Sequence, residues 1–134
     1  MGDYELPATL RFTANDEWVR VAGSRITVGI TDFAQQQLGD VVFVELPETG
    51  KSFDKGEPFG VIESVKAVAD LYAPVAGEIV EVNTDLSERP EAVNEDCYGD
   101  GWMIVIAVAD AAELESLLGP DEYSASVAAR ESDH

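Results

Sequence analysis

The fold is decided by residues 60–74, which read Gly60-Val61-Ile62-Glu63-Ser64-Val65-Lys66-Ala67-Val68-Ala69-Asp70-Leu71-Tyr72-Ala73-Pro74. Two apolar strands, at 59–63 and 68–72, flank a short turn that contains Lys66. The spacing predicts a β-hairpin with Lys66 at its tip, where four methylenes carry the amine into solvent. Most exposed turn lysines have no function, so the local pattern alone indicates a reachable amine and no more.

Further short strands are expected on both sides of this hairpin. They lie at residues 18–21, 26–30, 41–46, 78–82 and 102–108. The segments 48–58 and 83–101 are rich in loop-forming residues. Residues 41–63 and 68–108 each read as strand, loop and strand, which favours a sandwich of two small sheets with Lys66 at one exposed end.

Helices are expected at two places. Thr31 or Asp32 can cap a short helix at 32–38, and Gly39 suits the left-handed position at its end. The second place is the C-terminal segment at 110–129. The 134 residues therefore predict a single mainly β domain, with a core at about 12–109.

Within the C-terminal segment, a first helix is expected after Asp110, with Glu113 completing a capping box. Its apolar face would consist of Leu114, Leu117 and Leu118. Gly119-Pro120 is read as its stop, followed by a weaker helix at 121–129.

The charge excludes several classes of partner. Eight Lys and Arg residues stand against 27 Asp and Glu residues, so the formal net charge is −19. Nucleic acids and anionic membranes need basic patches, so we expect neither as a partner. No run approaches the roughly 20 apolar residues of a membrane span, and Met1–Glu5 does not resemble a signal or transit peptide. A cytoplasmic protein of a prokaryote is expected, and the sequence also fits a mature mitochondrial form.

Catalytic machinery is sparse. Cys97 is the single cysteine and His134, the last residue, is the single histidine. A cysteine-based metal cluster, a Ser-His-Asp triad and a Cys-His pair are therefore not expected, and we predict neither catalytic residues nor metal ligands. Phosphate-binding glycine motifs are also absent from the sequence.

Several blocks of the sequence, inside and outside the hairpin, belong to one recognisable pattern. One block is the segment 62–67, followed after residues 68–71 by Tyr72-Ala73-Pro74-Val75-Ala76-Gly77-Glu78-Ile79. The other blocks are 29–35, 38–47 and 93–102. In this order, across roughly residues 12–123, the blocks closely resemble the H-protein family of the glycine cleavage system. The hairpin resembles the lipoylation segment of that family. Two positions depart from it, since Asp16 stands where the family usually has histidine and Cys97 where it usually has proline.

The resemblance implies a lipoyl/biotinyl-type barrel-sandwich and a non-catalytic carrier with lipoate in amide linkage to Lys66. It also implies three partner enzymes. Glycine decarboxylase (P protein) loads an aminomethyl group, aminomethyltransferase (T protein) passes its carbon to tetrahydrofolate, and dihydrolipoamide dehydrogenase (L protein) takes the electrons. A lipoylating enzyme is the fourth partner.

Further site residues follow from the same resemblance. The neighbours of Lys66 are expected to be recognised by the lipoylating enzyme, and they are Glu63, Ser64, Val65 and Ala67. Glu17 and Asp70 are expected to line a cleft for the loaded arm, where a carboxylate would pair with the aminomethyl cation.

Two other kinds of carrier share parts of this pattern and differ from it at the lysine. Biotin carriers share the hairpin lysine but usually flank it with methionines, whereas Val65 and Ala67 stand here. Lipoyl domains of 2-oxo-acid dehydrogenases usually have Asp before the lysine and belong to longer chains. An H-like protein that only relays lipoate to other enzymes stays open as an alternative.

The acidity leads to a first prediction. Dense carboxylates stay hydrated in concentrated salt and their repulsion is screened, so we hypothesise a high-salt cytoplasm. The free energy of unfolding is expected to rise with KCl concentration in denaturant titrations. A flat or falling dependence would refute the hypothesis.

Overall fold

A computed structural model describes residues 4 and 6–131 of the chain. Within them, nine β-strands, three α-helices and two 3₁₀ helices follow one another. The strands are β1 (Arg11–Phe12), β2 (Glu17–Ala22), β3 (Arg25–Ile30), β4 (Val41–Glu45), β5 (Ser52–Phe53), β6 (Pro58–Ser64), β7 (Val68–Tyr72), β8 (Gly77–Val82) and β9 (Ile104–Val108). The helices are α1 (Asp32–Leu38), η1 (Thr84–Ser87), α2 (Ala92–Glu95), η2 (Ala111–Ser116) and α3 (Pro120–Glu131).

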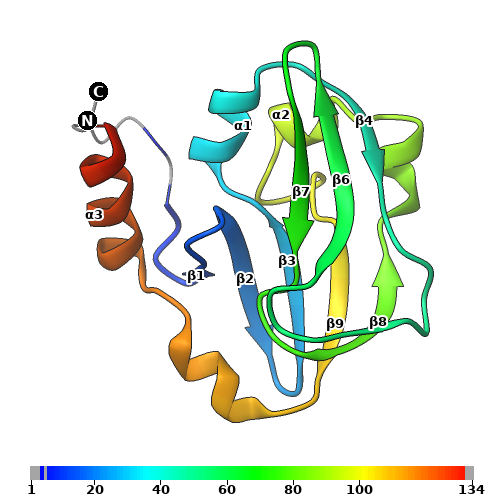
Figure 1. The fold of residues 1–134 in the computed structure, drawn as a ribbon, viewed down its shortest axis with the longest axis vertical. Helices are drawn as coiled ribbons and strands as arrows, with labels where there is room; N and C mark the ends of the chain where they lie inside the picture. The colour runs from blue at the N-terminus through cyan, green and yellow to red at the C-terminus, as the bar shows by residue number, and fades with distance from the viewer. Residues whose placement is uncertain (1–3, 5, 132–134) are drawn as a thin grey trace.

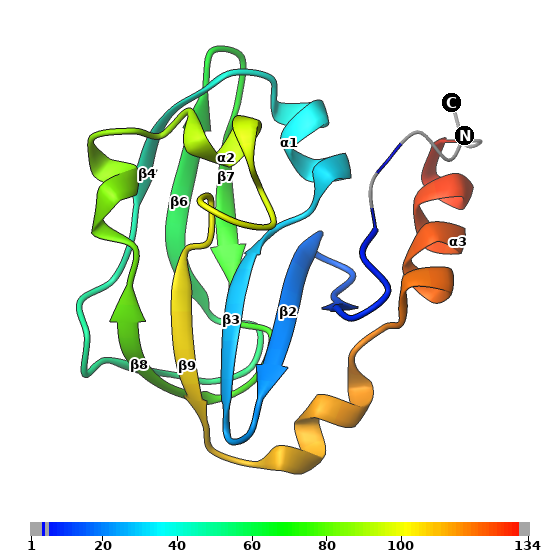
Figure 2. The ribbon, with the colours of Figure 1, turned by 180° about the vertical axis from the view of Figure 1, so that it is seen from behind.

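The strands form two antiparallel sheets that face each other (Figure 1). The larger sheet has the order β1-β2-β3-β9-β8-β5, and the smaller has the order β4-β6-β7. The expected two-sheet sandwich is therefore confirmed, with sheets of unequal size. The β6–β7 hairpin projects beyond the sheets on the side where α1 and α2 lie, and the view from behind shows α3 set apart beside β2 (Figure 2).

Two apolar clusters stabilise this arrangement. The larger fills the space between the sheets, with Val28 and Ile106 from one sheet and Ile62 and Leu71 from the other, all at most 2% exposed. The alternation predicted along the strands places these side chains inward. The smaller cluster lies under α3 and contains Leu10, Phe12, Trp18, Phe33, Tyr123 and Val127. It joins the start of β2 to the C-terminal helix.

The predicted strands are all present, with ends that differ by one or two residues. The last strand begins at Ile104 rather than at residue 102. The two predicted loops contain short elements that composition did not reveal. The two-residue strand β5 pairs with β8, and η1 and α2 lie within 83–101. Two residues or one helical turn are too short to leave a periodic pattern.

The short helix α1 is confirmed together with both of its caps. Thr31 has extended backbone dihedrals, and its hydroxyl accepts a hydrogen bond from the Ala34 amide at 3.2 Å. Gly39 ends the helix at φ 78°, a conformation that glycine adopts without strain. Its amide donates to the Gln35 carbonyl at 3.0 Å.

The first C-terminal helix is present after Asp110 as predicted, but its type and its contacts differ from the prediction. The Asp110 carboxylate does cap the segment by accepting from the Ala112 amide, but η2 is a 3₁₀ helix. Glu113 does not complete a capping box, because its carboxylate accepts from the Ala76 amide at 2.7 Å. The predicted leucine face is divided, since Leu114 and Leu117 pack on the larger cluster and Leu118 on the smaller one. Tertiary contacts outweigh the local pattern here.

The prediction that the second C-terminal helix is the weaker of the two was also wrong. The longer helix is α3, of 12 residues, and Pro120 is its first residue rather than a stop. Proline suits this position because its missing amide hydrogen would have no partner within the helix. The Glu122 carboxylate then accepts from the Gly119 amide at 2.9 Å, which is half of a capping box. The sequence pattern predicts no helix beyond residue 129, whereas α3 continues to Glu131, and residues 132–134 lie outside the described residues.

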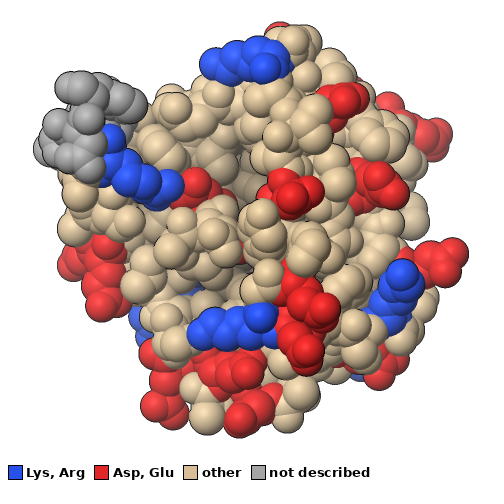
Figure 3. Space-filling model, viewed as in Figure 1, with Lys and Arg blue, Asp and Glu red and all other residues tan. Residues whose placement is uncertain are grey.

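On the face shown in Figure 3, acidic side chains lie at several separate places rather than in one block. On the face of Figure 3, a basic side chain lies over the tip of the β6–β7 hairpin. In the sequence, Lys66 is the one Lys or Arg between Lys55 and Arg89. The hairpin tip is therefore a local cationic point on an acidic protein.

Candidate functional site

The turn at the hairpin tip is organised by the hydroxyl of Ser64. This oxygen accepts hydrogen bonds from the Lys66 amide at 3.2 Å and the Ala67 amide at 3.1 Å. The hydroxyl also lies 3.3 Å from the Ala67 carbonyl, and the Ser64 amide donates to the same carbonyl at 2.8 Å. Ser64 is 6% exposed, so it shapes the turn from inside and presents little surface to a partner.

The turn is also fixed to the end of α1. The Val65 amide donates to the Asp40 carbonyl at 3.0 Å. Asn94 of α2 secures this junction, because its side-chain amide donates to the Gly39 carbonyl at 2.8 Å and accepts from the Val41 amide at 2.8 Å. Sequence reasoning included Asn94 in the family resemblance but assigned it no role. No local sequence signal marks this role, because its partners Gly39 and Val41 lie 55 and 53 residues away along the chain.

The Lys66 side chain extends from this fixed turn. Its Cε atom lies 3.6 Å from the position that a Cβ on Gly39 would occupy, so the aliphatic stem passes over the end of α1. Lys66 and Ala67 are exposed. Among the described residues, Lys66 belongs to neither of the two ion pairs, which join Arg89 to Glu95 and Arg130 to Asp16. A primary amine on a short stem, held by a rigid turn, is well suited to amide formation.

Exposed apolar side chains gather around the lysine. In the described part of the chain, five large hydrophobic residues are exposed, and four of them lie here: Val42 at 50%, Phe43 at 47%, Val65 at 69% and Val68 at 64%. Phe43 and Val68 flank the exposed Glu63 across the three strands of the smaller sheet. This surface can contact a partner that approaches Lys66.

Glu17 is a buried carboxylate at the start of β2. It is 1% exposed, and its two oxygens accept from the Thr13 hydroxyl at 2.8 Å and the Tyr72 amide at 3.0 Å. Burial raises the pKa of Glu17 to about 7, while the two hydrogen bonds act in the opposite direction and the Asp16 charge adds to the rise. Glu17 can therefore take or release a proton near neutral pH.

The structure brings Glu17 close to the strand that carries Asp70 but does not put the two carboxylates in one hollow. Glu17 binds the Tyr72 amide, two residues beyond the exposed Asp70 on β7. Glu17 lines a hollow of about 230 Å³ with Thr13 and Lys55. Asp70 lines a second hollow of about 480 Å³, together with residues of β4 and β6. The expected arm cleft therefore stays a prediction.

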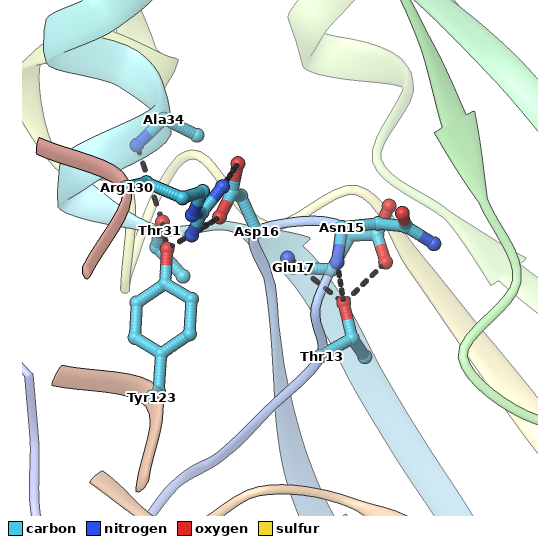
Figure 4. Close-up of polar contacts among 8 residues, drawn as sticks. All are labelled: Thr13, Asn15, Asp16, Glu17, Thr31, Ala34, Tyr123 and Arg130. Carbon is cyan, nitrogen blue, oxygen red and sulfur yellow. Dashed lines mark hydrogen bonds and ion pairs between the residues drawn. The ribbon is translucent and has the colours of Figure 1, made fainter. Parts of the chain in front are cut away.

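The two departures from the family pattern lie beside the small cluster under α3, and position 97 contributes through its backbone carbonyl. Asp16 points away from the Glu17 hollow, and Arg130 holds its carboxylate with bonds of 2.7 and 3.2 Å (Figure 4). Cys97 is buried, and its carbonyl accepts from the Trp18 indole at 2.8 Å. Both positions stabilise the small cluster under α3.

Residues 4 and 6–131 contain no group of three or more His, Cys, Asp or Glu side chains placed to hold a metal ion. None of the helices described there has the length and apolar character needed to cross a membrane.

The pKa of Glu17 predicts a pH-dependent stability. Because this pKa rises from 4.5 to about 7, the folded state holds a proton that the unfolded state releases between these values. Stability contributed by protonated Glu17 is thus lost as pH rises through this window, by roughly 3 kcal/mol at most. Compared with Glu17→Gln, the unfolding free energy of the native protein is expected to fall between pH 4.5 and 8 in urea titrations. The control Glu63→Gln removes an exposed acid and should follow the native protein. Equal pH dependence in Glu17→Gln would contradict the assignment.

Comparison with known proteins identifies the family. The model of the glycine cleavage H-protein family matches residues 10–130. The glycine cleavage system H protein of Rubrobacter xylanophilus is 58% identical over 120 residues, which cover 90% of this chain and 93% of the relative. A probable glycine cleavage system H protein of Haloarcula marismortui is 54% identical over 120 residues, covering 90% of this chain and 94% of the relative. The crystal structure of the H protein from Mycobacterium marinum superposes with a TM-score of 0.81 at 39% identity, covering 92% of this chain and 99% of that one. The chain belongs to the glycine cleavage H-protein family.

Proposed function

We propose that the chain is the lipoyl carrier of a glycine cleavage system, with lipoate joined through an amide to the Nζ atom of Lys66. The observation that carries the proposal is the rigid, exposed hairpin that presents this lysine in a member of the H-protein family. Lipoate supplies the dithiolane that receives the aminomethyl group and the electrons. The side chains of the protein itself hold, orient and shield the lipoyl arm.

The residues present fit a covalently attached arm. The Lys66 stem passes over Gly39 at the end of α1, with its Cε atom 3.6 Å from the position that a Cβ on Gly39 would occupy. Amide formation removes the charge of the amine and leaves an apolar arm, and the exposed Val65 and Val68 provide apolar surface next to it. Once a partner is docked, a short tether can present the arm at an effective concentration of roughly millimolar.

The partners in this proposal are glycine decarboxylase, aminomethyltransferase and dihydrolipoamide dehydrogenase, together with the lipoylating enzyme. The exposed Val65, Ala67 and Glu63 are available to the lipoylating enzyme at the tip, whereas the buried Ser64 contributes by shaping the turn. Phe43 widens the apolar surface beside them. We place this work in the cytoplasm of a prokaryote.

Attachment at Lys66 has a direct test. Intact-mass measurement of the protein after incubation with a lipoylating enzyme, ATP and lipoate should show one lipoyl addition in the native chain and none in Lys66→Ala. The variants Lys51→Ala and Lys55→Ala remove the other two lysines and should still be modified. A biotin addition, or a lipoyl addition that survives Lys66→Ala, would overturn the proposal.

Glycine–bicarbonate exchange with glycine decarboxylase then distinguishes glycine cleavage from lipoate relay. The lipoylated native protein is expected to support exchange, and lipoylated protein that supports none would identify a relay protein instead.

The arm-cleft prediction concerns Glu17 and Asp70. Along an extended strand, Asp70 lies roughly 13 Å from Lys66 and Tyr72 roughly 20 Å, and Glu17 binds the Tyr72 amide. A carboxylate there can pair with the aminomethyl cation and limit its contact with water. The double variant Glu17→Gln/Asp70→Asn is expected to lose the bound group several-fold faster, measured as formaldehyde release. The control Glu78→Gln removes an exposed acid of β8 and should keep the native rate. Unchanged release from the double variant would refute the cleft.

A further inference from the structure

The C-terminal helix reaches the Glu17 site through one residue, Asp16. Asp16 has φ 69°, the one positive φ among the described non-glycine residues. This left-handed conformation costs free energy for a residue with a side chain, so the surroundings have to hold it. The Asp16 amide donates to the Thr13 carbonyl, and its own carbonyl accepts from the Thr31 amide at 3.0 Å.

The Asp16 side chain is held from α3. Arg130 donates from Nη2 to Oδ1 at 2.7 Å and from Nη1 to Oδ2 at 3.2 Å, a two-point contact that fixes the plane of the carboxylate. The Tyr123 hydroxyl donates to Oδ1 at 2.9 Å. Burial raises the pKa of Tyr123, so this hydroxyl keeps its proton.

The hydrogen bonds form a chain with one direction. The ionised Asp16 carboxylate only accepts, so the Tyr123 hydroxyl gives it its single proton. The Thr31 hydroxyl, 2.7 Å from the Tyr123 oxygen, must then donate to it. Thr31 accepts in turn from the Ala34 amide (Figure 4). The start of α1, the turn before β2 and helix α3 are thus joined at Asp16.

Glu17 follows Asp16 directly, and the two carboxylates point to opposite sides of the turn (Figure 4). The dihedral angles of Asp16 decide this opposition, because they set the direction in which the chain enters β2. With Asp16 anchored, Glu17 reaches both the Thr13 hydroxyl and the Tyr72 amide.

We propose that Arg130 and Tyr123, acting through Asp16, are positioning residues for the Glu17 carboxylate. Helix α3 is then part of the site that holds and shields the aminomethyl group, which we call the cargo-guarding site. This inference rests on the proposed function for its biological role. The geometric part concerns the unmodified protein, and it can be tested there.

The first test follows the titration of the Glu17 carboxyl by ¹³C NMR. Burial is the largest cause of its shift, the Asp16 charge adds to it, and Lys55 lines the same hollow. In Arg130→Met the carboxylate is expected to gain contact with water, which lowers its titration midpoint by about one pH unit, because burial is a larger cause of the raised pKa than the Asp16 charge that the variant leaves unpaired. Arg130→Lys keeps the charge and should recover most of the native midpoint.

Two further variants make this test decisive. Arg89→Met removes an exposed arginine with the same change in net charge and should leave the midpoint unchanged. Tyr123→Phe removes one hydroxyl, retains the ring that stacks on Phe12, and should lower the midpoint in a folded protein even if Arg130→Met does not fold. If Arg130→Met folds and keeps the native midpoint, α3 merely stabilises the domain and the inference is overturned. If Arg130→Met does not fold, a native midpoint in Tyr123→Phe overturns the inference in the same way.

The second test uses the lipoylated, aminomethyl-loaded protein. Arg130→Met is expected to release formaldehyde roughly threefold faster or more, as loss of a positioned group does, and to add nothing in the Glu17→Gln background. Additive effects would mean that Arg130 acts elsewhere, which overturns the inference. If the native protein holds the group no longer than free lipoamide does, the cargo-guarding proposal fails, while the NMR result still decides the positioning of Glu17.

Discussion

The position of the exposed Lys66 depends on the hydrogen bonds that the buried Ser64 hydroxyl accepts within the turn. A hairpin tip that presents an amine to other proteins has to be accessible, and accessible turns tend to move. Ser64 resolves this conflict from inside, because it accepts from the amides of Lys66 and Ala67 while being 6% exposed itself. The Val65–Asp40 bond and Asn94 transmit this order to α1 and α2. The root of the arm is thereby fixed relative to the rest of the fold.

Local patterns were sufficient to predict much of this arrangement. The hairpin, the strand at each side and the capped helix α1 all carry their information within a few residues, as alternating side chains, a threonine cap and a terminal glycine. Burial of Ser64 was harder to foresee, since its sequence context shows only a small polar residue in a turn. Its burial arises when two distant segments pack together, since Ser64 pairs with Val41 and the next residue, Val65, donates to the Asp40 carbonyl.

The C-terminal region shows where such prediction ends. Asp110, Glu113 and the three leucines form a regular helical pattern, yet Glu113 is drawn to the Ala76 amide and the leucines divide between two clusters. The chosen partner of Asp16 is 114 residues away, so no window of sequence contains both ends of that ion pair. Contacts of this range become visible only in the folded chain.

A buried carboxylate in a chain of net charge −19 looks unfavourable, and its pKa explains how it is tolerated. At a pKa of about 7, Glu17 is neutral for much of the time near neutral pH, which avoids part of the cost of desolvation and of repulsion by Asp16. A cation brought beside it would favour the ionised form, because opposite charges attract strongly where water is scarce. Binding a cation at Glu17 would therefore release a proton. A site of this kind is selective for positive charge without holding a permanent negative charge in the core, and its selectivity requires that the carboxylate stay in one place.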